Sequence, residues 1–78
     1  MGHKKKVIFT LHSRERMKLR GVTEEEVVDT ISKPTISSPK RPDNTIEFRR
    51  KVGSREYYVV VEVLNNKEML VITTGWKE

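Results

Sequence analysis

The sequence predicts a single α+β domain over residues 1–78, with two N-terminal helices packed on one face of a three- to four-stranded antiparallel sheet. Residues 14–33 contain two helix-type segments that end at a glycine or ahead of a proline, and both are common helix stop signals. Residues 45–74 contain three segments rich in strand-forming residues, separated by short turn sequences. Two helices followed by a run of strands is the element order of a two-layer α+β domain, and 78 residues have room for one core.

The first helix is expected over residues 14–20, which are all good helix formers. Gly21 follows in the place where a left-handed residue commonly ends a helix, and Arg20 lies near the negative end of the helix dipole. A short apolar run at residues 7–9 predicts a further edge strand. Residues 1–6 are basic, and we expect a flexible basic tail there.

The second helix has the clearest start signal in the sequence. Thr23 and Glu26 have the spacing of a capping box, in which each side chain accepts a hydrogen bond from the other residue's backbone N–H. Val22 and Val27 occupy the positions of a hydrophobic staple around that box. Because a proline interrupts helical hydrogen bonding, the helix is predicted to stop before Pro34.

The last part of the chain predicts three strands joined by two short turns. A loop comes first, because residues 32–44 hold all three prolines and show no periodicity. Gly53-Ser54 and Asn65-Asn66 are suited to two-residue hairpin turns. The strands and turns are expected at residues 45–52, 53–54, 55–64, 65–66 and 67–74.

Two-residue turns would fix which residues of neighbouring strands lie opposite each other. One face is then apolar, and the helices are expected to cover it: Phe48 opposite Val59, Ile46 opposite Val61, Val61 opposite Leu70 and Val59 opposite Ile72. The other face mixes basic, acidic, aromatic and apolar residues. It places Arg49 opposite Tyr58 and Glu47 opposite Val60, with Val71 beside them on the third strand. Function is expected on this second face, because the core occupies the first.

The formal net charge of +5 is unevenly distributed along the chain. Residues 1–22 and 33–55 carry net charges of +6 and +5, whereas residues 23–32 carry −4 and residues 56–78 carry −2. Two basic segments on either side of an acidic helix are more typical of a binding surface for a polyanion than of uniform solubilising charge. Chance clustering on a solvated surface is the alternative.

The composition argues against several classes of protein. With no cysteine there is no disulfide framework, no thiolate nucleophile and no Cys-type zinc site. His3 and His12 are the only histidines, too few for an all-histidine metal site, so no metal or other cofactor is expected. No apolar run approaches the roughly 18 residues needed to cross a membrane, so we expect a cytoplasmic protein without membrane contact.

His12, Arg16 and Arg20 are spaced by four residues, so on a helix that begins near His12 they lie in one stripe. Guanidinium groups bind phosphate bidentately. An imidazole beside them is suited to remove the proton of an RNA 2′-hydroxyl as it attacks the adjacent phosphate, without a metal ion. The alternative for His12 is structural, as a cap at the helix start or a ring bonded to a backbone carbonyl.

A second group of candidate residues lies on the open face of the predicted sheet. Arg49, Lys51 and Tyr58 are expected there, with Arg55 at the hairpin end. Bases that contact phosphate and an aromatic ring that stacks on a nucleobase are typical of single-stranded RNA recognition. We therefore take these four residues and Arg20 as candidate nucleic-acid-binding residues. An ordinary exposed cross-strand pair is the alternative for Arg49 and Tyr58.

Residues 9–27 resemble the opening signature of a family of small uncharacterised proteins. In that signature a His and an Arg four residues later are followed by Met, Arg-Gly, an aliphatic residue and an acidic second helix. The family is similar to the RelE/ParE and BrnT toxins and, more remotely, to the barnase, EndoU and colicin ribonucleases. The resemblance implies a RelE-like fold with His12 and Arg16 as catalytic residues, because these two match the motif. Residues 74–78 depart from the pattern, since they lack the Arg and Tyr that RelE-type nucleases use near the C-terminus.

Taken together, these observations predict an RNA-binding protein. The resemblance makes metal-independent endoribonuclease activity of the RelE-like toxin type a candidate activity for it. The alternative is a non-catalytic nucleic-acid-binding or protein-interaction module on the same fold. The expected partners are RNA, free or on the ribosome, and an antitoxin-like protein that covers the basic surface.

Overall fold

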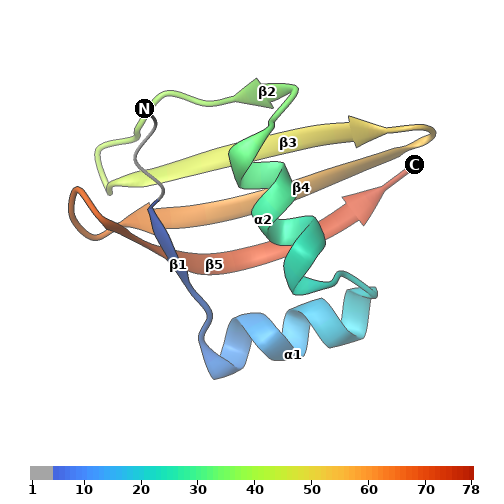
Figure 1. The fold of residues 1–78 in the computed structure, drawn as a ribbon, viewed down its shortest axis with the longest axis horizontal. Helices are drawn as coiled ribbons and strands as arrows, with labels where there is room; N and C mark the ends of the chain where they lie inside the picture. The colour runs from blue at the N-terminus through green and yellow to red at the C-terminus, as the bar shows by residue number, and fades with distance from the viewer. Residues whose placement is uncertain (1–4) are drawn as a thin grey trace.

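The computed structural model describes residues 5–78. Within them the chain forms two helices and one five-stranded sheet of order β1-β5-β4-β3-β2 (Figure 1). The elements follow in the order β1 (Lys6–Ile8), α1 (Leu11–Arg20), α2 (Glu24–Ser32), β2 (Ile36–Ser37), β3 (Thr45–Val52), β4 (Arg55–Val63) and β5 (Glu68–Lys77). The predicted α+β class is confirmed.

The sheet is mixed, which corrects the prediction of three to four antiparallel strands. β3, β4 and β5 form the predicted antiparallel meander, but β1 pairs parallel with β5. A short turn imposes antiparallel pairing on the strands it joins. Because almost the whole chain separates β1 from β5, packing of the chain between them sets their relative direction.

A fifth strand, β2, lies inside the segment that was predicted to be a loop. Its backbone pairs with β3 through two flanking bonds, from the N–H of Thr35 to the carbonyl of Arg49 (2.7 Å) and from the N–H of Ser38 to the carbonyl of Glu47 (2.9 Å). The short strand lies between Pro34 and Pro39 and is an edge strand, the part of a sheet where nearby prolines are tolerated.

A threonine caps the start of each helix. Thr10 and Ser13 form a capping box, so α1 begins earlier than its run of helix formers indicated. Thr23 and Glu26 form the predicted box at the start of α2. Gly21 follows α1 with a φ of 69°, which is the predicted left-handed conformation.

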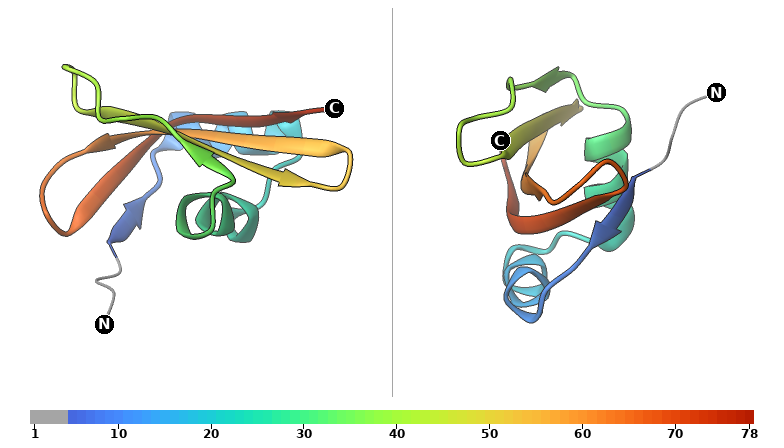
Figure 2. Two further views of the ribbon diagram at one scale, coloured as in Figure 1. Left: turned by 90° about the horizontal axis from the view of Figure 1, so that it is seen from above. Right: turned by 90° about the vertical axis from the view of Figure 1, so that its left-hand side faces the viewer.

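The two helices occupy different parts of the sheet. α2 lies across β3 and β4 on one face, and α1 runs beside β5 (Figures 1 and 2). α2 therefore occupies the face that was predicted for both helices. Neither helix covers the opposite side of β3 and β4, which we call the outer face.

The core lies between the helices and the inner face of the meander. Its fully buried side chains come from α1, α2, β4 and β5: Ser13, Val27, Thr30, Val59, Val61, Val71 and Thr74. In the β3–β4 hairpin, the predicted pairs are confirmed, with Phe48 opposite Val59 and Ile46 opposite Val61. The two-residue turn at residues 53–54 is confirmed as well, because Val52 pairs with Arg55.

The predicted register of β5 is wrong. Two observed pairs show the shift: Val61 opposite Val71 and Val59 opposite Thr74, where Leu70 and Ile72 were expected. The turn before β5 is longer than two residues, and a bulge interrupts the β4–β5 ladder. Because a one-residue slip exchanges the two faces of a strand, Val71 is buried in the core while Ile72 is 38% exposed.

The expected basic tail is shorter than residues 1–6. Lys6 already belongs to β1, and its N–H donates to the carbonyl of Lys67 at 2.6 Å. Residues 1–4, which the prediction also placed in the tail, lie outside the described part of the chain.

Candidate nucleic-acid interface

A row of four residues crosses the outer face, one from each of four neighbouring strands. Ile36 lies opposite Arg49, Arg49 opposite Tyr58, and Tyr58 opposite Gly75. The row brings together Arg49 and Tyr58, two of the residues that the sequence selected, and adds Gly75, which it did not.

The ring of Tyr58 lies over the backbone of Gly75. A Cβ atom built on Gly75 would stand 2.5 Å from the Tyr58 Oη, 2.8 Å from Cζ and 3.0 Å from Cε1. The first two separations are shorter than real Cβ contacts, so a side chain at position 75 would displace the Tyr58 ring. Gly75 therefore allows the ring to reach across towards β5.

The Tyr58 hydroxyl meets Arg20 at the C-terminal end of α1. Arg20 donates three hydrogen bonds from Nη1: to Tyr58 Oη (3.2 Å), to Thr73 Oγ1 (3.3 Å) and to the backbone carbonyl of Thr74 (3.0 Å). All three acceptors are uncharged, and no carboxylate of residues 5–78 lies within salt-bridge distance of Arg20. Arg20 thus carries an oriented positive charge without a counter-ion, and its Nε–Nη2 edge has no partner among those residues.

The C-terminus of α1 is fixed from the other side by Trp76. Its indole Nε1 donates to the carbonyl of Arg20 at 2.8 Å, and the guanidinium of Arg55 stacks 4.0 Å from the ring centroid. These contacts anchor Trp76 between the end of α1 and the end of the sheet. They also hold the backbone that carries the Arg20 side chain.

Arg16 lies one turn before Arg20 on α1, and His12 lies two turns before it. Arg16 Nε donates to His12 Nε2 over 3.4 Å, a long hydrogen bond between accessible side chains. The helix cap is made by Thr10 and Ser13. Within residues 5–78, the His12 ring is therefore neither a cap at the helix start nor bonded to a backbone carbonyl.

Arg49 differs from Arg20 because its charge is compensated. Its Nε donates to Glu47 Oε2 at 3.0 Å, while Arg41 Nη2 donates to Glu47 Oε1 at 3.2 Å. Partial burial acts to raise the pKa of Glu47, but the bonds and charges of Arg49 and Arg41 outweigh it, so the pKa lies below its usual value. The three side chains line an open hollow of about 230 Å³ with Ile36 and Ser38.

The two remaining candidates are placed apart from this row. Lys51 lies opposite Glu56 near the hairpin end and is exposed. Arg55 does not join Tyr58: it donates to the Tyr57 hydroxyl at 3.4 Å and stacks on Trp76. A strand alternates its faces, so Arg55 shares the side of Tyr57 and points away from the outer face.

Glu26 is bound at the opposite, inner side of the sheet. Its carboxylate accepts hydrogen bonds from the Thr23 N–H (2.9 Å) and the Tyr57 hydroxyl (2.8 Å). Partial burial acts to raise its pKa, but these two bonds, with Arg55 nearby, lower the pKa below its usual value. The group joins the start of α2 to β4 and lies apart from the outer face.

Comparison with known protein families identifies a family whose function is unknown. The sequence model of a domain of unknown function, DUF4258, matches residues 9–76. The chain belongs to the DUF4258 family. Neither the curated proteins nor the solved structures contain a significant match to it.

In this DUF4258 chain, the sequence analysis did not select three groups of β5 that form the site. Gly75 lies under the Tyr58 ring, and the Thr73 hydroxyl and the Thr74 carbonyl accept hydrogen bonds from Arg20. A glycine inside a strand is a recognised sign of close approach by another group. That sign was missed because the last strand was predicted to end at residue 74, whereas β5 continues to Lys77.

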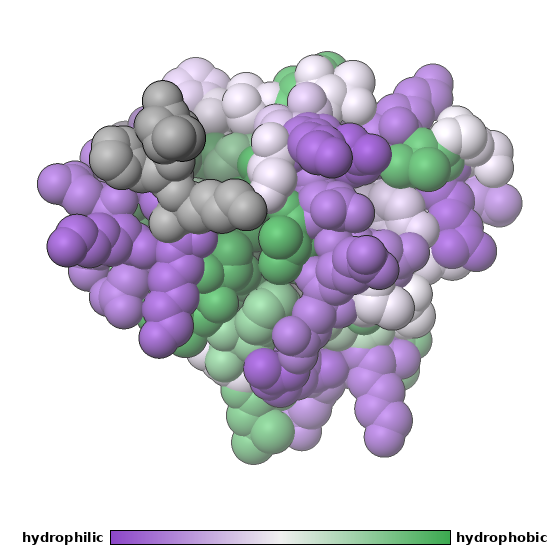
Figure 3. Space-filling view, viewed as in Figure 1, coloured by the Kyte–Doolittle hydropathy of each residue, from purple (hydrophilic) through white to green (hydrophobic). Residues whose placement is uncertain are grey.

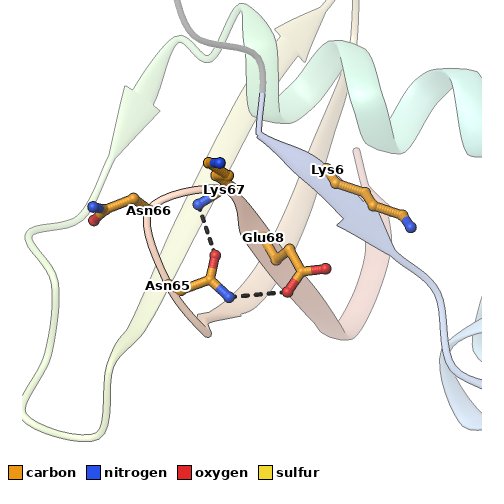
Figure 4. A pocket seen from close by; sticks show the side chains of 5 residues that line it. All are labelled: Lys6, Asn65, Asn66, Lys67 and Glu68. Carbon is orange, nitrogen blue, oxygen red and sulfur yellow. Dashed lines mark hydrogen bonds between the residues drawn. The ribbon is translucent and has the colours of Figure 1, made fainter.

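Other parts of the DUF4258 surface offer weaker candidates. A hollow of about 520 Å³ is lined by Lys6 and residues 65–68, but there Asn65 bonds to Glu68 and to the N–H of Lys67, which closes the turn (Figure 4). Hydrophobic surface is visible around β1 and α1 from the α2 side (Figure 3). Leu11 and Leu19 on α1 are 78% and 76% exposed.

Residues 5–78 contain neither a helix that could cross a membrane nor a cluster of metal ligands. Neither α1 nor α2 is long and apolar enough to cross a membrane. No group of three or more His, Asp or Glu side chains in that part of the chain is arranged to hold a metal ion.

Proposed function

We propose that this DUF4258 protein binds RNA through the surface formed by His12, Arg16 and Arg20 on α1 and Tyr58 on the outer face. The observation that carries the proposal is the position of Arg20. Its guanidinium is oriented by three uncharged acceptors and keeps its charge uncompensated beside a sheet face that neither helix covers.

A phosphate group suits the unused edge of Arg20. The Nε and Nη2 groups donate in parallel, which is the geometry of bidentate phosphate binding. Because Nη1 is already occupied, this edge is held in place before a ligand arrives, which reduces the entropy lost on binding. Arg16 lies one turn away on the same helix and extends the positive surface.

Tyr58 supplies the second feature that supports RNA. One face of its ring packs over Gly75, and we expect the partly buried ring to present its other face to a nucleobase. Stacking of this kind is typical of single-stranded RNA binding and contributes about 1–3 kcal/mol per base.

The test compares Arg20→Gln with Lys18→Gln. Both remove one positive charge from α1, but two residues correspond to about 200° of helix rotation, so Lys18 lies on the opposite side. With a fluorescein-labelled single-stranded RNA in a fluorescence anisotropy titration, Arg20→Gln should weaken binding about tenfold or more, as expected for charge-assisted hydrogen bonds. Lys18→Gln should weaken it about twofold at most, because an exposed distant charge is screened.

Three further results decide the outcome. Affinity should fall steeply with KCl concentration, since neutralised phosphates release counterions. Equal losses for the two variants, with both still folded by circular dichroism, would assign binding to general charge and refute the site. Absent RNA binding, or a flat salt response, would favour the protein-interaction module.

Metal-independent cleavage of the bound RNA is a second candidate function, favoured by the contact between Arg16 and His12. An imidazole can act as a general base in this reaction, and the guanidinium of Arg16 beside it can bind the phosphate. Incubation with mRNA in EDTA, with and without ribosomes and across about pH 5–8, should yield fragments that disappear in His12→Ala. Binding without fragments under every condition would remove cleavage and leave RNA binding in place.

A further inference from the structure

The hollow on the outer face between β2 and β3 has the groups needed to recognise a nucleobase. Ile36 is 61% exposed and contributes an apolar wall, and Glu47 lies beside it with Arg41 and Arg49. Its volume of about 230 Å³ is below the range of about 300–1,000 Å³ that is usual for drug-sized ligands. A fragment as small as one base therefore matches its size.

The Glu47 carboxylate still has acceptor capacity. Each oxygen receives one hydrogen bond, Oε1 from Arg41 and Oε2 from Arg49, whereas an ionised carboxylate offers about four acceptor sites. Arg49 uses only its Nε in this contact, so its Nη groups have no hydrogen-bond partner within residues 5–78. A fixed pair of acceptors thus lies next to unused donors.

Guanine presents the complementary pattern. Its N1–H and N2–H groups are adjacent donors that match a carboxylate, and its neighbouring O6 is an acceptor that matches a guanidinium. Adenine and cytosine turn an unprotonated ring nitrogen towards the same position, and uracil offers only one N–H there. The Watson–Crick edge of guanine is accessible when the RNA is single-stranded.

We infer that the hollow formed by Ile36, Ser38, Arg41, Glu47 and Arg49 selects guanine in single-stranded RNA. The inference rests on the proposed RNA binding and gives that site its base preference. Arg49 lies in the same cross-sheet row as Tyr58 and Gly75, and neighbouring strands are about 4.8 Å apart. One short oligonucleotide can therefore occupy the hollow while its backbone reaches Arg20.

The experiment measures affinity for oligouridine strands that differ at one central position. Fluorescence anisotropy at a fixed salt concentration should give about tenfold tighter binding with guanosine than with adenosine, cytidine or uridine there, the discrimination expected of a bidentate contact. Inosine lacks the N2 amino group, so an inosine strand should bind with intermediate affinity. Glu47→Gln should abolish the guanosine preference.

The readout for Glu47→Gln is the ratio of affinities for the guanosine and adenosine strands, because removal of the acid also raises the net charge and with it all RNA affinities. Glu56→Gln, which removes an acid from the same face near the hairpin end, serves as the control and should keep the ratio. Equal affinities for the four wild-type complexes would overturn guanine selection while leaving RNA binding intact. A preference that persists in a folded Glu47→Gln protein would place recognition elsewhere, and absent binding of every strand would overturn both proposals.

Discussion

Replacement of Gly75 by alanine tests the close packing of the Tyr58 ring against the backbone of Gly75 on the outer face. The backbone of Gly75 is outside the left-handed region, so alanine can adopt its conformation. The new Cβ would stand 2.5 Å from the Tyr58 hydroxyl oxygen, and this atom is at the free end of a side chain. We expect Tyr58 to rotate away from Gly75 and to lose its 3.2 Å hydrogen bond from Arg20.

The size of the effect follows from the contacts at the two residues. A hydrogen bond to a charged donor contributes about 1.5–3 kcal/mol to stability. Alanine in a strand adds about 0.5–1 kcal/mol to the free energy of unfolding relative to glycine, because an unfolded chain with alanine has fewer conformations to lose on folding. The net loss is therefore about 1–2 kcal/mol, which for a chain of this size lowers the Tm by roughly 4–16 °C. Arg20 keeps its bonds to Thr73 and Thr74, so the protein should stay folded.

A double-mutant cycle gives the decisive measurement. Urea unfolding of the wild type, Gly75→Ala, Tyr58→Ala and the double variant isolates the coupling between the two positions. In the Tyr58→Ala background Gly75→Ala should be neutral or slightly stabilising, because no ring is displaced. The reasoning is refuted if Gly75→Ala costs the same in both backgrounds. RNA affinity should fall in the single Gly75→Ala variant, because the Arg20 edge is then less firmly oriented.

Two further predictions concern the start of α2. Thr23→Ala should lower the free energy of unfolding by about 1 kcal/mol, because it removes the acceptor for the Glu26 N–H, and urea denaturation that shows no loss would contradict the capping box. Glu26 has a folded-state pKa below its usual 4.5, so its stabilising contribution is present above about pH 4.5 and is lost as the pH falls through the folded-state pKa. Stability measured between about pH 3 and 7 should therefore rise less steeply with pH in Glu26→Gln than in the wild type, and identical slopes would exclude this linkage.

The sequence predicted best where the deciding signal is local. The Thr23–Glu26 box, the left-handed Gly21 and the turn before Arg55 each depend on a few consecutive residues, and each is confirmed. The pairing of β3 with β4 follows from that short turn, which leaves little freedom of register. The same reasoning failed for β5, because its longer turn and its bulge have no comparable signature.

The candidate site was predicted only as a set of residue types. Spacing on α1 indicated a common stripe for His12, Arg16 and Arg20, and pairing within the hairpin placed Arg49 opposite Tyr58. Nothing local distinguished the compensated charge of Arg49 from the uncompensated charge of Arg20. That difference depends on Glu47, which forms an ion pair with Arg49 and none with Arg20.

The amino-acid sequence alone predicts the α+β class, the two helices, the capping box of α2, the left-handed Gly21, the β3–β4 hairpin and the uneven distribution of basic charge. These properties follow from local backbone preferences and from composition. Only the tertiary structure decided the parallel pairing of β1 with β5 and the meeting of Arg20 with Tyr58 over Gly75. Both bring together groups far apart along the chain, and their positions are set by the packing of the whole core rather than by any preference of the residues concerned.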